Sequence, residues 1–284
     1  MRLLGAVSQG SGKVNEDGWG FLGEPEDVAA AWIFDGVTGI NTQNYLGAGS
    51  DAQWLVARAH EYLLDLAAGD MPLDRLLEEL VAGLMADWAS VSAGLDLPRD
   101  YDPPAACLIL VKRYGAEWHA LRLGDSCLLT RGGDGGVQIF AQSPNNDFDR
   151  WLTREARKRR DEGVLDIKAL LAEFAPQLKA GRARRNRPGG YSILECSRDA
   201  LAMPKFILLG SPAEILLCTD GYYRAVDGYQ LHDDESLLNS SATSVDAVLA
   251  QLRAVEASDP DCIRFPRFKP ADDATAVMLA AAAR

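Results

Sequence analysis

Cysteine and histidine are scarce in this chain of 284 residues, which contains five cysteines and three histidines. The cysteines are scattered, odd in number and without a Cys-x-x-Cys pair, so the sequence argues against a zinc site and a disulfide framework. Three of them lie in apolar, strand-like runs, where a free cysteine behaves as a small hydrophobic residue. We therefore expect a reducing compartment. The five are Cys107, Cys127, Cys196, Cys218 and Cys262, of which the first, second and fourth lie in apolar runs.

Positive charge is scarce as well, because 29 lysines and arginines stand against 41 aspartates and glutamates, a formal net charge of −12. A surface of this sign repels nucleic acid and anionic membranes, so we expect neither as a partner.

Long apolar runs are missing too: none approaches the length of a membrane span, and the apolar start is too short for the core of a signal peptide. We therefore expect a cytoplasmic protein. The sequence does not indicate its oligomeric state.

Apolar periodicity divides the chain into strands and helices. The strands come in runs separated by Gly-rich turns, which predicts antiparallel pairing, and the helices also come in runs. Because strands and helices do not alternate regularly, an α+β layered fold is favoured over a doubly wound sheet. Strands are predicted at 2–7, 18–22, 30–34, 106–112, 117–123, 127–131, 137–141, 192–195, 214–218 and 274–280, and helices at 51–68, 72–88 and 244–255.

One segment breaks the acidic pattern. Residues 150–190 contain 12 lysines and arginines against 5 aspartates and glutamates. The segment predicts two helices and a basic loop, which form an insertion at about 148–190. The loop, which includes Arg184 and Arg185, is either a solvated surface or a clamp for a phosphate or an acidic substrate.

Four acidic segments lie next to predicted strands. Asp-Gly directly follows an apolar run at 35–36 and again at 220–221, and further acidic residues occur at 15–18 and 272–275. Each segment alone is ordinary turn sequence, and for each one that interpretation stays open. Together, four carboxylate-bearing segments at strand ends can converge on one point and supply the oxygen ligands that hard divalent cations prefer.

Five short motifs occur in a fixed order along the chain: N-E-D at 15–17, F-D-G-V-T-G at 34–39, L-G-D-S at 123–126, C-T-D-G at 218–221 and D-D-A-T at 272–275. In this order they resemble the protein phosphatase type 2C family of metal-dependent serine/threonine phosphatases, in its bacterial form. The resemblance spans nearly the whole chain. It implies a four-layer αββα sandwich, with two central antiparallel sheets flanked by helices, and a single phosphatase-like catalytic domain over residues 1–284.

The resemblance also implies the ligands of two Mg²⁺ or Mn²⁺ ions. Asp35 would bridge both ions, and the carbonyl of Gly36 would bind one of them. Asp17 would help to hold one ion, and Asp220 and Asp272 would hold the other. The four aspartates are thus the predicted catalytic residues.

Two further acidic positions are less determined by the motifs. Asp273 stands where the family often has Asn, so Asp272 is the preferred ligand of that pair. Asp125, in L-G-D-S, is either a ligand of a third metal ion or a residue that caps a hairpin turn.

The chain departs from the family pattern at two positions. Many members have a His after the first Asp-Gly, proposed as a general acid, where this chain has Val37, which cannot donate a proton. The phosphate-binding Arg expected three residues before N-E-D is replaced by Gly12, followed by Lys13. The Lys13 ammonium can attract a phosphate by its charge, but it cannot form the two parallel hydrogen bonds that an arginine guanidinium forms. Arg184 and Arg185 are the predicted substitutes for the missing Arg.

The predicted function is hydrolysis of phosphoserine and phosphothreonine in a phosphorylated protein. The resemblance implies in-line attack by a hydroxide that bridges the two ions. Two alternatives remain open: a non-catalytic pseudophosphatase that serves as a binding or regulatory module, and a metallophosphatase that acts on a small phosphoester. The presence of all four ligand aspartates favours activity.

Overall fold

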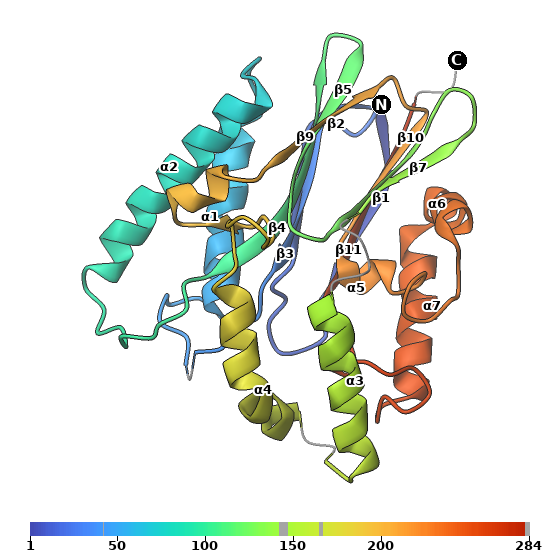
Figure 1. The fold of residues 1–284 in the computed structure, drawn as a ribbon. Helices are drawn as coiled ribbons and strands as arrows, with labels where there is room; N and C mark the ends of the chain where they lie inside the picture. Colours follow the sequence, from blue (N-terminus) through green and yellow to red (C-terminus); the bar gives the residue numbers. More distant parts are fainter. Residues whose placement is uncertain (42, 142–146, 165–166, 282–284) are drawn as a thin grey trace.

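Two antiparallel sheets stacked face to face form the centre of the molecule, and helices cover both outer faces (Figure 1). The computed structural model describes residues 1–284 apart from 42, 142–146, 165–166 and 282–284. The predicted αββα sandwich is confirmed. Within the described ranges, no helix is long and apolar enough to cross a membrane.

The first sheet combines strands from both ends of the chain, in the order β1-β11-β10-β6-β7. All neighbours are antiparallel. The end of β1, the end of β10 and the start of β11 therefore meet at one end of this sheet. Its strands are β1 (Arg2–Gln9), β6 (Cys127–Arg131), β7 (Val137–Phe140), β10 (Glu214–Cys218) and β11 (Ala274–Ala280).

The second sheet has the order β2-β3-β4-β5-β9, and the short β8 pairs with β4. Its neighbours are also antiparallel, and the register places Asp35 of β3 opposite Cys107 of β4. Its strands are β2 (Gly18–Glu24), β3 (Asp27–Gly36), β4 (Ala105–Tyr114), β5 (Glu117–Leu123), β8 (Leu194–Glu195) and β9 (Lys205–Gly210).

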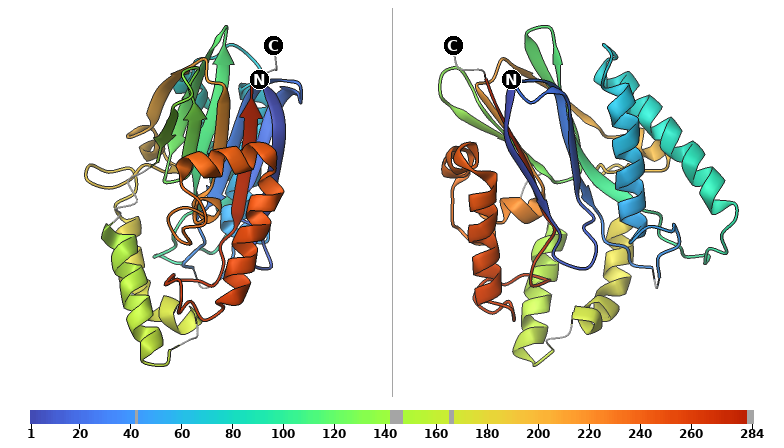
Figure 2. Two further views of the ribbon diagram at one scale, coloured as in Figure 1. Left: turned by 90° about the vertical axis from the view of Figure 1, so that its right-hand side faces the viewer. Right: turned by 180° about the vertical axis from the view of Figure 1, so that it is seen from behind.

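Helices α1 and α2 cover the second sheet, and α5, α6 and α7 cover the first (Figure 1). Helices α3 and α4 project beyond one end of the sheets (Figure 2). The helices are α1 (Asp51–Leu66), α2 (Leu73–Ser92), α3 (Asp147–Asp161), α4 (Ile167–Arg182), α5 (Asp220–Tyr223), α6 (Asp234–Thr243) and α7 (Val245–Ser258), with a 3₁₀ turn at Arg198–Leu201.

Strand β3 shows how the layers are held together. Successive side chains of a strand point to opposite faces, so Trp32 and Phe34 pack against α1 and α2 while Ile33 packs against the other sheet. Ile33 meets Ile215 and Leu217 of β10 there, and all five side chains are fully buried. Burial of such a side chain contributes roughly 1.5–3 kcal/mol. A strand with two buried faces therefore reads as a continuous apolar run in the sequence.

Most predicted elements are present, and four strands have the predicted bounds: β5, β6, β10 and β11. Two helices form within the predicted insertion, although residues 165–166 lie outside the described residues. Strand β9 and the helices α5 and α6 were not predicted. All three have weak periodicity: β9 exposes Phe206 and Leu208 on one sheet edge, α5 has only four residues, and α6 is short and rich in Ser.

Candidate metal centre

Four strand ends bring acidic segments from distant parts of the sequence to one end of the sheets. Asp35 is near the end of β3, and Asp17 directly precedes β2, the neighbouring strand. Asp220 lies just after β10 and Asp272 just before β11, which are also neighbours. Hydrogen bonds join the two sheets here; in one of them Thr219 Oγ1 donates to Asp17 Oδ2 at 3.0 Å. The structure thus brings the four predicted ligands together.

The carboxylates of this group act on one another. Burial is the largest influence on Asp35 and raises the pKa of its carboxyl well above the ordinary range. The negative charges of Asp220, Asp17, Asp125 and Asp272, in that order, raise it further. A carboxylate held among other carboxylates away from water is stable only when it is protonated or when a cation lies beside it.

Asp17 and Asp220 respond in the same direction. Burial raises the pKa of Asp17 strongly, although hydrogen bonds from Thr275 and Thr219 act against it. Burial, and after it the charge of Asp272, raises the pKa of Asp220 to about 7. Both groups are therefore short of positive charge.

The donor set fits divalent cations of the Mg²⁺ or Mn²⁺ type. Its atoms are all oxygen: the carboxylates of Asp17, Asp35, Asp220 and Asp272, and the carbonyl of Gly36. Hard cations prefer oxygen ligands, and a divalent ion supplies the charge that the raised pKa values call for. The chemistry of the residues thus admits a metal centre.

The two Asp-Gly steps are not hairpin turns. Gly36 lies within β3 and Gly221 within α5. A Cβ atom on Gly36 would lie 2.4 Å from the Glu16 carbonyl oxygen, and one on Gly221 would lie 1.9 Å from the Asp273 carbonyl oxygen. Both glycines are therefore required because another segment of the centre passes against their backbone.

Asp273 holds the neighbouring loop in place. Its carboxylate accepts hydrogen bonds from the Ser11 backbone amide at 2.7 Å, from the Ser11 hydroxyl at 2.9 Å and from the Glu16 amide at 2.7 Å. These bonds fix the loop between β1 and β2, which carries Asp17. Asp272, next to it, instead forms ion pairs with Arg224 and Lys269.

Asp125 lies at the same end of the sheets, after β5. Its Oδ1 accepts a hydrogen bond from Cys107 Sγ at 3.1 Å. One ligand atom each from Asp35, Cys107 and Asp125 lies within 4.8 Å of the others. Burial raises the pKa of the Cys107 thiol well above its usual range, so the thiol remains protonated and donates. Asp125 thus lies beside Asp35.

The predicted substrate-binding cations take three different positions. Lys13 is exposed in the loop after β1. Arg184 is exposed and donates to the Gly189 carbonyl oxygen. Arg185 is buried and forms an ion pair with Asp102 at 3.1 Å. A guanidinium held in a buried ion pair is not free to bind phosphate, so the structure does not favour Arg185 as a phosphate clamp.

Another arginine connects helix α4 to the centre. Arg182 forms an ion pair with Asp102, and its Nη2 donates to the Thr38 carbonyl oxygen at 2.5 Å. The Thr38 hydroxyl in turn donates to Glu16 Oε2 at 2.6 Å. Arg182, Asp102 and Arg185 also line a cavity of about 400 Å³ beside this connection. The basic insertion therefore borders the carboxylates through the segment after β3.

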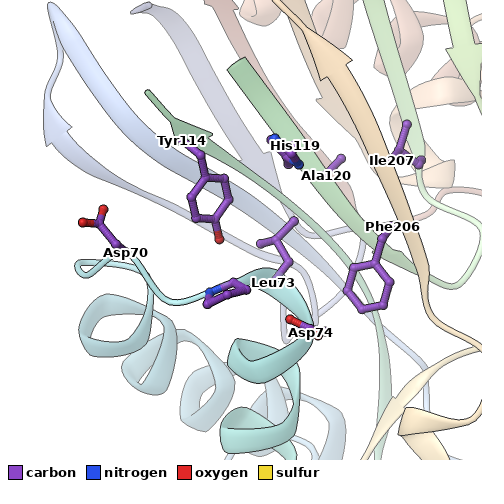
Figure 3. Close-up of a pocket in the computed structure, with 9 residues that line it drawn as sticks. Asp70, Leu73, Asp74, Tyr114, His119, Ala120, Phe206 and Ile207 are labelled. Atoms are coloured by element: carbon purple, nitrogen blue, oxygen red, sulfur yellow. The ribbon is translucent and has the colours of Figure 1, made fainter. Parts of the chain in front are cut away.

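A second cavity, of about 530 Å³, lies elsewhere on the second sheet (Figure 3). Tyr114, His119 and Phe206 line it from β4, β5 and β9, and Asp70 and Asp74 lie at its α2 side. Tyr114 and His119 belong to the parts of β4 and β5 remote from Cys107 and Leu123, by which the metal centre lies. This cavity is therefore not part of the metal centre.

A sequence model of the family described as Protein phosphatase 2C matches residues 4–259. The chain belongs to this family. The match includes four of the five motifs and ends before D-D-A-T at 272–275. No curated protein matches the chain.

Solved structures of bacterial phosphatases have the same fold. The Mycobacterium tuberculosis serine/threonine phosphatase PstP/Ppp is 17% identical, with 96% of each chain covered and a TM-score of 0.56. PppA from Pseudomonas aeruginosa is 18% identical, with 96% of this chain and 95% of PppA covered and a TM-score of 0.53. Another structure holds the PstP catalytic domain in complex with two manganese ions, at 16% identity, 96% and 95% coverage and a TM-score of 0.55.

Several residues of the centre were not identified from the sequence. Thr38 and Thr219 lie inside the motifs, so their proximity to the aspartates was a usable signal. Arg224 follows Asp220 by one helical turn and Lys269 lies in the loop before β11, but neither belongs to a motif. Cys107 lies beside Asp35 because the two residues are paired in the register of β3 and β4, and this register cannot be deduced from the sequence.

Proposed function

We propose that this protein is a metal-dependent phosphatase that hydrolyses phosphoserine and phosphothreonine in proteins. The observation that supports it most is the convergence of four aspartates, from four distant segments, at one end of the sheets. Asp35 lies at the centre of the group, since Asp220, Asp17, Asp125 and Asp272 all raise its pKa. Family membership supports the same reaction class.

Asp17, Asp35, Asp220, Asp272 and the Gly36 carbonyl would hold two Mg²⁺ or Mn²⁺ ions, with Asp125 as a candidate ligand of a third. When bound, the ions supply Lewis acidity, which neutralises charge on the phosphoryl group and lowers the pKa of the attacking water. The protein's own contribution is to fix the ligands.

Several contacts of the chain fix those ligands. The Thr219 hydroxyl orients Asp17, and Asp273 holds the loop that carries it. The β3–β4 pairing fixes Asp35. Rigid placement of this kind supports catalysis because ligand geometry is set before the substrate arrives.

The leaving alkoxide takes its proton from water, because the position after the first Asp-Gly is Val37. The backbone amide of Val37 donates to the Ala105 carbonyl oxygen at 2.9 Å, and its side chain packs against the cluster of Ala105, Cys107 and Ile193. His60, on α1, accepts a hydrogen bond from Trp32 Nε1 at 3.3 Å and is thus part of the packing against the second sheet.

Phosphate release from p-nitrophenyl phosphate and from phosphoserine and phosphothreonine peptides tests the proposal. We expect Mn²⁺-dependent release that a chelator abolishes and that Asp35→Asn reduces by about 10³-fold or more. Asp96→Asn, in an exposed loop, serves as the matched control and retains activity. Metal binding without hydrolysis of any substrate supports the pseudophosphatase, and activity on small phosphoesters alone supports the metallophosphatase alternative.

A further inference from the structure

Two cations are built into one side of the metal centre. The Lys269 ammonium forms an ion pair with Asp272 Oδ1, and Arg224 Nη2 donates to Asp272 Oδ2 at 3.3 Å. Both carboxylate oxygens of a predicted metal ligand are therefore already paired. The charges of Arg224 and Lys269 also act on Asp220, where they oppose the rise of its pKa.

The backbone on both sides of Lys269 is held firmly. Arg160 of α3 donates to the carbonyl oxygens of Arg267 at 2.5 Å and Phe268 at 2.6 Å. Arg267 Nε donates to the Pro270 carbonyl oxygen at 2.8 Å. Lys269 thus starts from a fixed point, and its side chain is directed at Asp272 rather than into solvent.

The loop before β11 is itself organised around a buried ion pair. Arg267 Nη1 lies 2.6 Å from Asp259 Oδ2, and both side chains are buried. Burial opposes ionisation of Asp259, but the amides of Arg264 and Phe265 together with Arg267 outweigh it and lower its pKa to about 2. The loop therefore carries a permanent internal charge pair that sets its shape.

Arg224 reaches the same carboxylate from the other side. It ends α5, and its backbone amide donates to the Asp220 carbonyl oxygen at 2.9 Å, so one helical turn separates the cation from the ligand. The guanidinium then extends to Asp272. Two positive charges thus lie beside the two carboxylates, both paired with Asp272, and they offset the rise of the pKa of Asp220 only in part.

The groups that surround Asp17 and Asp35 differ from the cations that surround Asp272. Asp35 lies beside the Cys107 thiol and the Asp125 carboxylate, with one ligand atom of each within 4.8 Å of the others. The Asp17 carboxylate accepts a hydrogen bond from the neutral Thr219 hydroxyl at 3.0 Å. At Asp17 and Asp35 a divalent ion therefore meets carboxylates that lie beside a neutral hydroxyl and a neutral thiol. At Asp272 it has to displace resident cations.

We propose that Lys269, with Arg224, is a built-in cation that competes with the second divalent metal ion for Asp272. The two metal positions then differ in affinity, and at low metal concentration the protein holds one ion and remains inactive. The inference rests on the proposed metal centre and goes beyond it, because it makes the second metal ion a concentration-dependent switch.

Calorimetric titration of metal-stripped protein with Mn²⁺ tests this directly. Wild type is expected to show one tighter and one weaker site, and Lys269→Gln to tighten the weaker site by ~10-fold or more, the size of effect typical of groups that contact metal ligands. Lys269→Arg keeps the charge and is expected to resemble wild type. Lys179→Met, which removes an exposed ion pair with Asp100, is the matched control and leaves both affinities unchanged. Arg224→Gln is a second variant, should Lys269→Gln fold poorly.

Three outcomes overturn the inference in distinguishable ways. Unchanged Mn²⁺ affinities in both Lys269→Gln and Arg224→Gln show that these residues do not compete with the metal. Unchanged affinities with a raised KM for a phosphopeptide show that Lys269 instead contacts the phosphate. If neither wild type nor the variants bind Mn²⁺, the proposed metal centre itself is wrong, and the inference falls with it.

Discussion

Replacement of Asp220 by Asn is expected to stabilise the metal-free protein while it removes metal-dependent activity. The fold raises the pKa of this carboxyl from 3.8 to about 7, mainly through burial and the charge of Asp272. Because the folded state binds the proton more tightly, the full stability is present below pH 3.8 and is lost as the pH rises through 7. A rise of about three pKa units corresponds to ~4 kcal/mol.

The neighbouring carboxylates share this penalty, so we expect Asp220→Asn alone to recover about 2–4 kcal/mol at pH 8. At pH 4 the difference between variant and wild type should vanish. Urea unfolding with chelator present, at pH 4, 6 and 8, measures both proteins. Asp96→Asn, at an exposed loop position, controls for the general effect of one fewer negative charge.

With Mn²⁺ added, wild type should become more stable than Asp220→Asn. Wild type gains stability because the ion binds only the folded state, whereas Asp220→Asn has lost a ligand and gains less. If the metal-free variant is no more stable than wild type at pH 8, or if its advantage is the same at pH 4, then Asp220 does not carry a buried charge that its surroundings compensate only in part. The account of the centre as a cluster short of positive charge would be refuted.

Three further changes probe how the centre is built. Gly36→Ala places a Cβ 2.4 Å from the Glu16 carbonyl oxygen and should cost about 1–3 kcal/mol in urea unfolding; an unchanged midpoint would exclude that close contact. Asp273→Ala removes its bonds to Ser11 and Glu16 and should cost roughly 2–3 kcal/mol and weaken Mn²⁺ binding, so normal calorimetry would contradict its loop-holding role. Arg267→Met leaves the buried Asp259 carboxylate without its ion-pair partner and should lower the free energy of unfolding, followed by heat, by ~3–5 kcal/mol. A loss under 1 kcal/mol would refute the role of this ion pair.

Much of the fold could be predicted from the sequence because its signals are local. Strand β10 is a short apolar run bounded by turn residues, and α7 begins at Ser244, whose side chain accepts the Ala247 amide at 3.2 Å. Edge strand β9 could not be predicted in this way. Its exposed Phe206 and Leu208 break the alternation on which strand prediction depends.

In the candidate site too, the features with a local sequence signal could be predicted and those that depend on tertiary packing could not. Aspartates at strand ends are visible in the sequence because an acidic residue directly after an apolar run is conspicuous. What surrounds them is not visible, because Lys269 and Arg224 meet Asp272 only through the packing of α5 and the loop before β11. The basic insertion shows the reverse case: its composition suggested a phosphate clamp, whereas the fold uses Arg185 to pair with Asp102.

Periodicity and short motifs act over a few neighbouring residues, so the amino-acid sequence was enough to predict the layered α+β class and the acidic residues of the candidate metal centre. Only the tertiary structure decided how the Asp-Gly steps are used. Gly36 and Gly221 are glycines because the backbones of Glu16 and Asp273, far away in sequence, pass against them. It also set the charge balance around the four aspartates, since long-range packing places Arg224 and Lys269 beside Asp272.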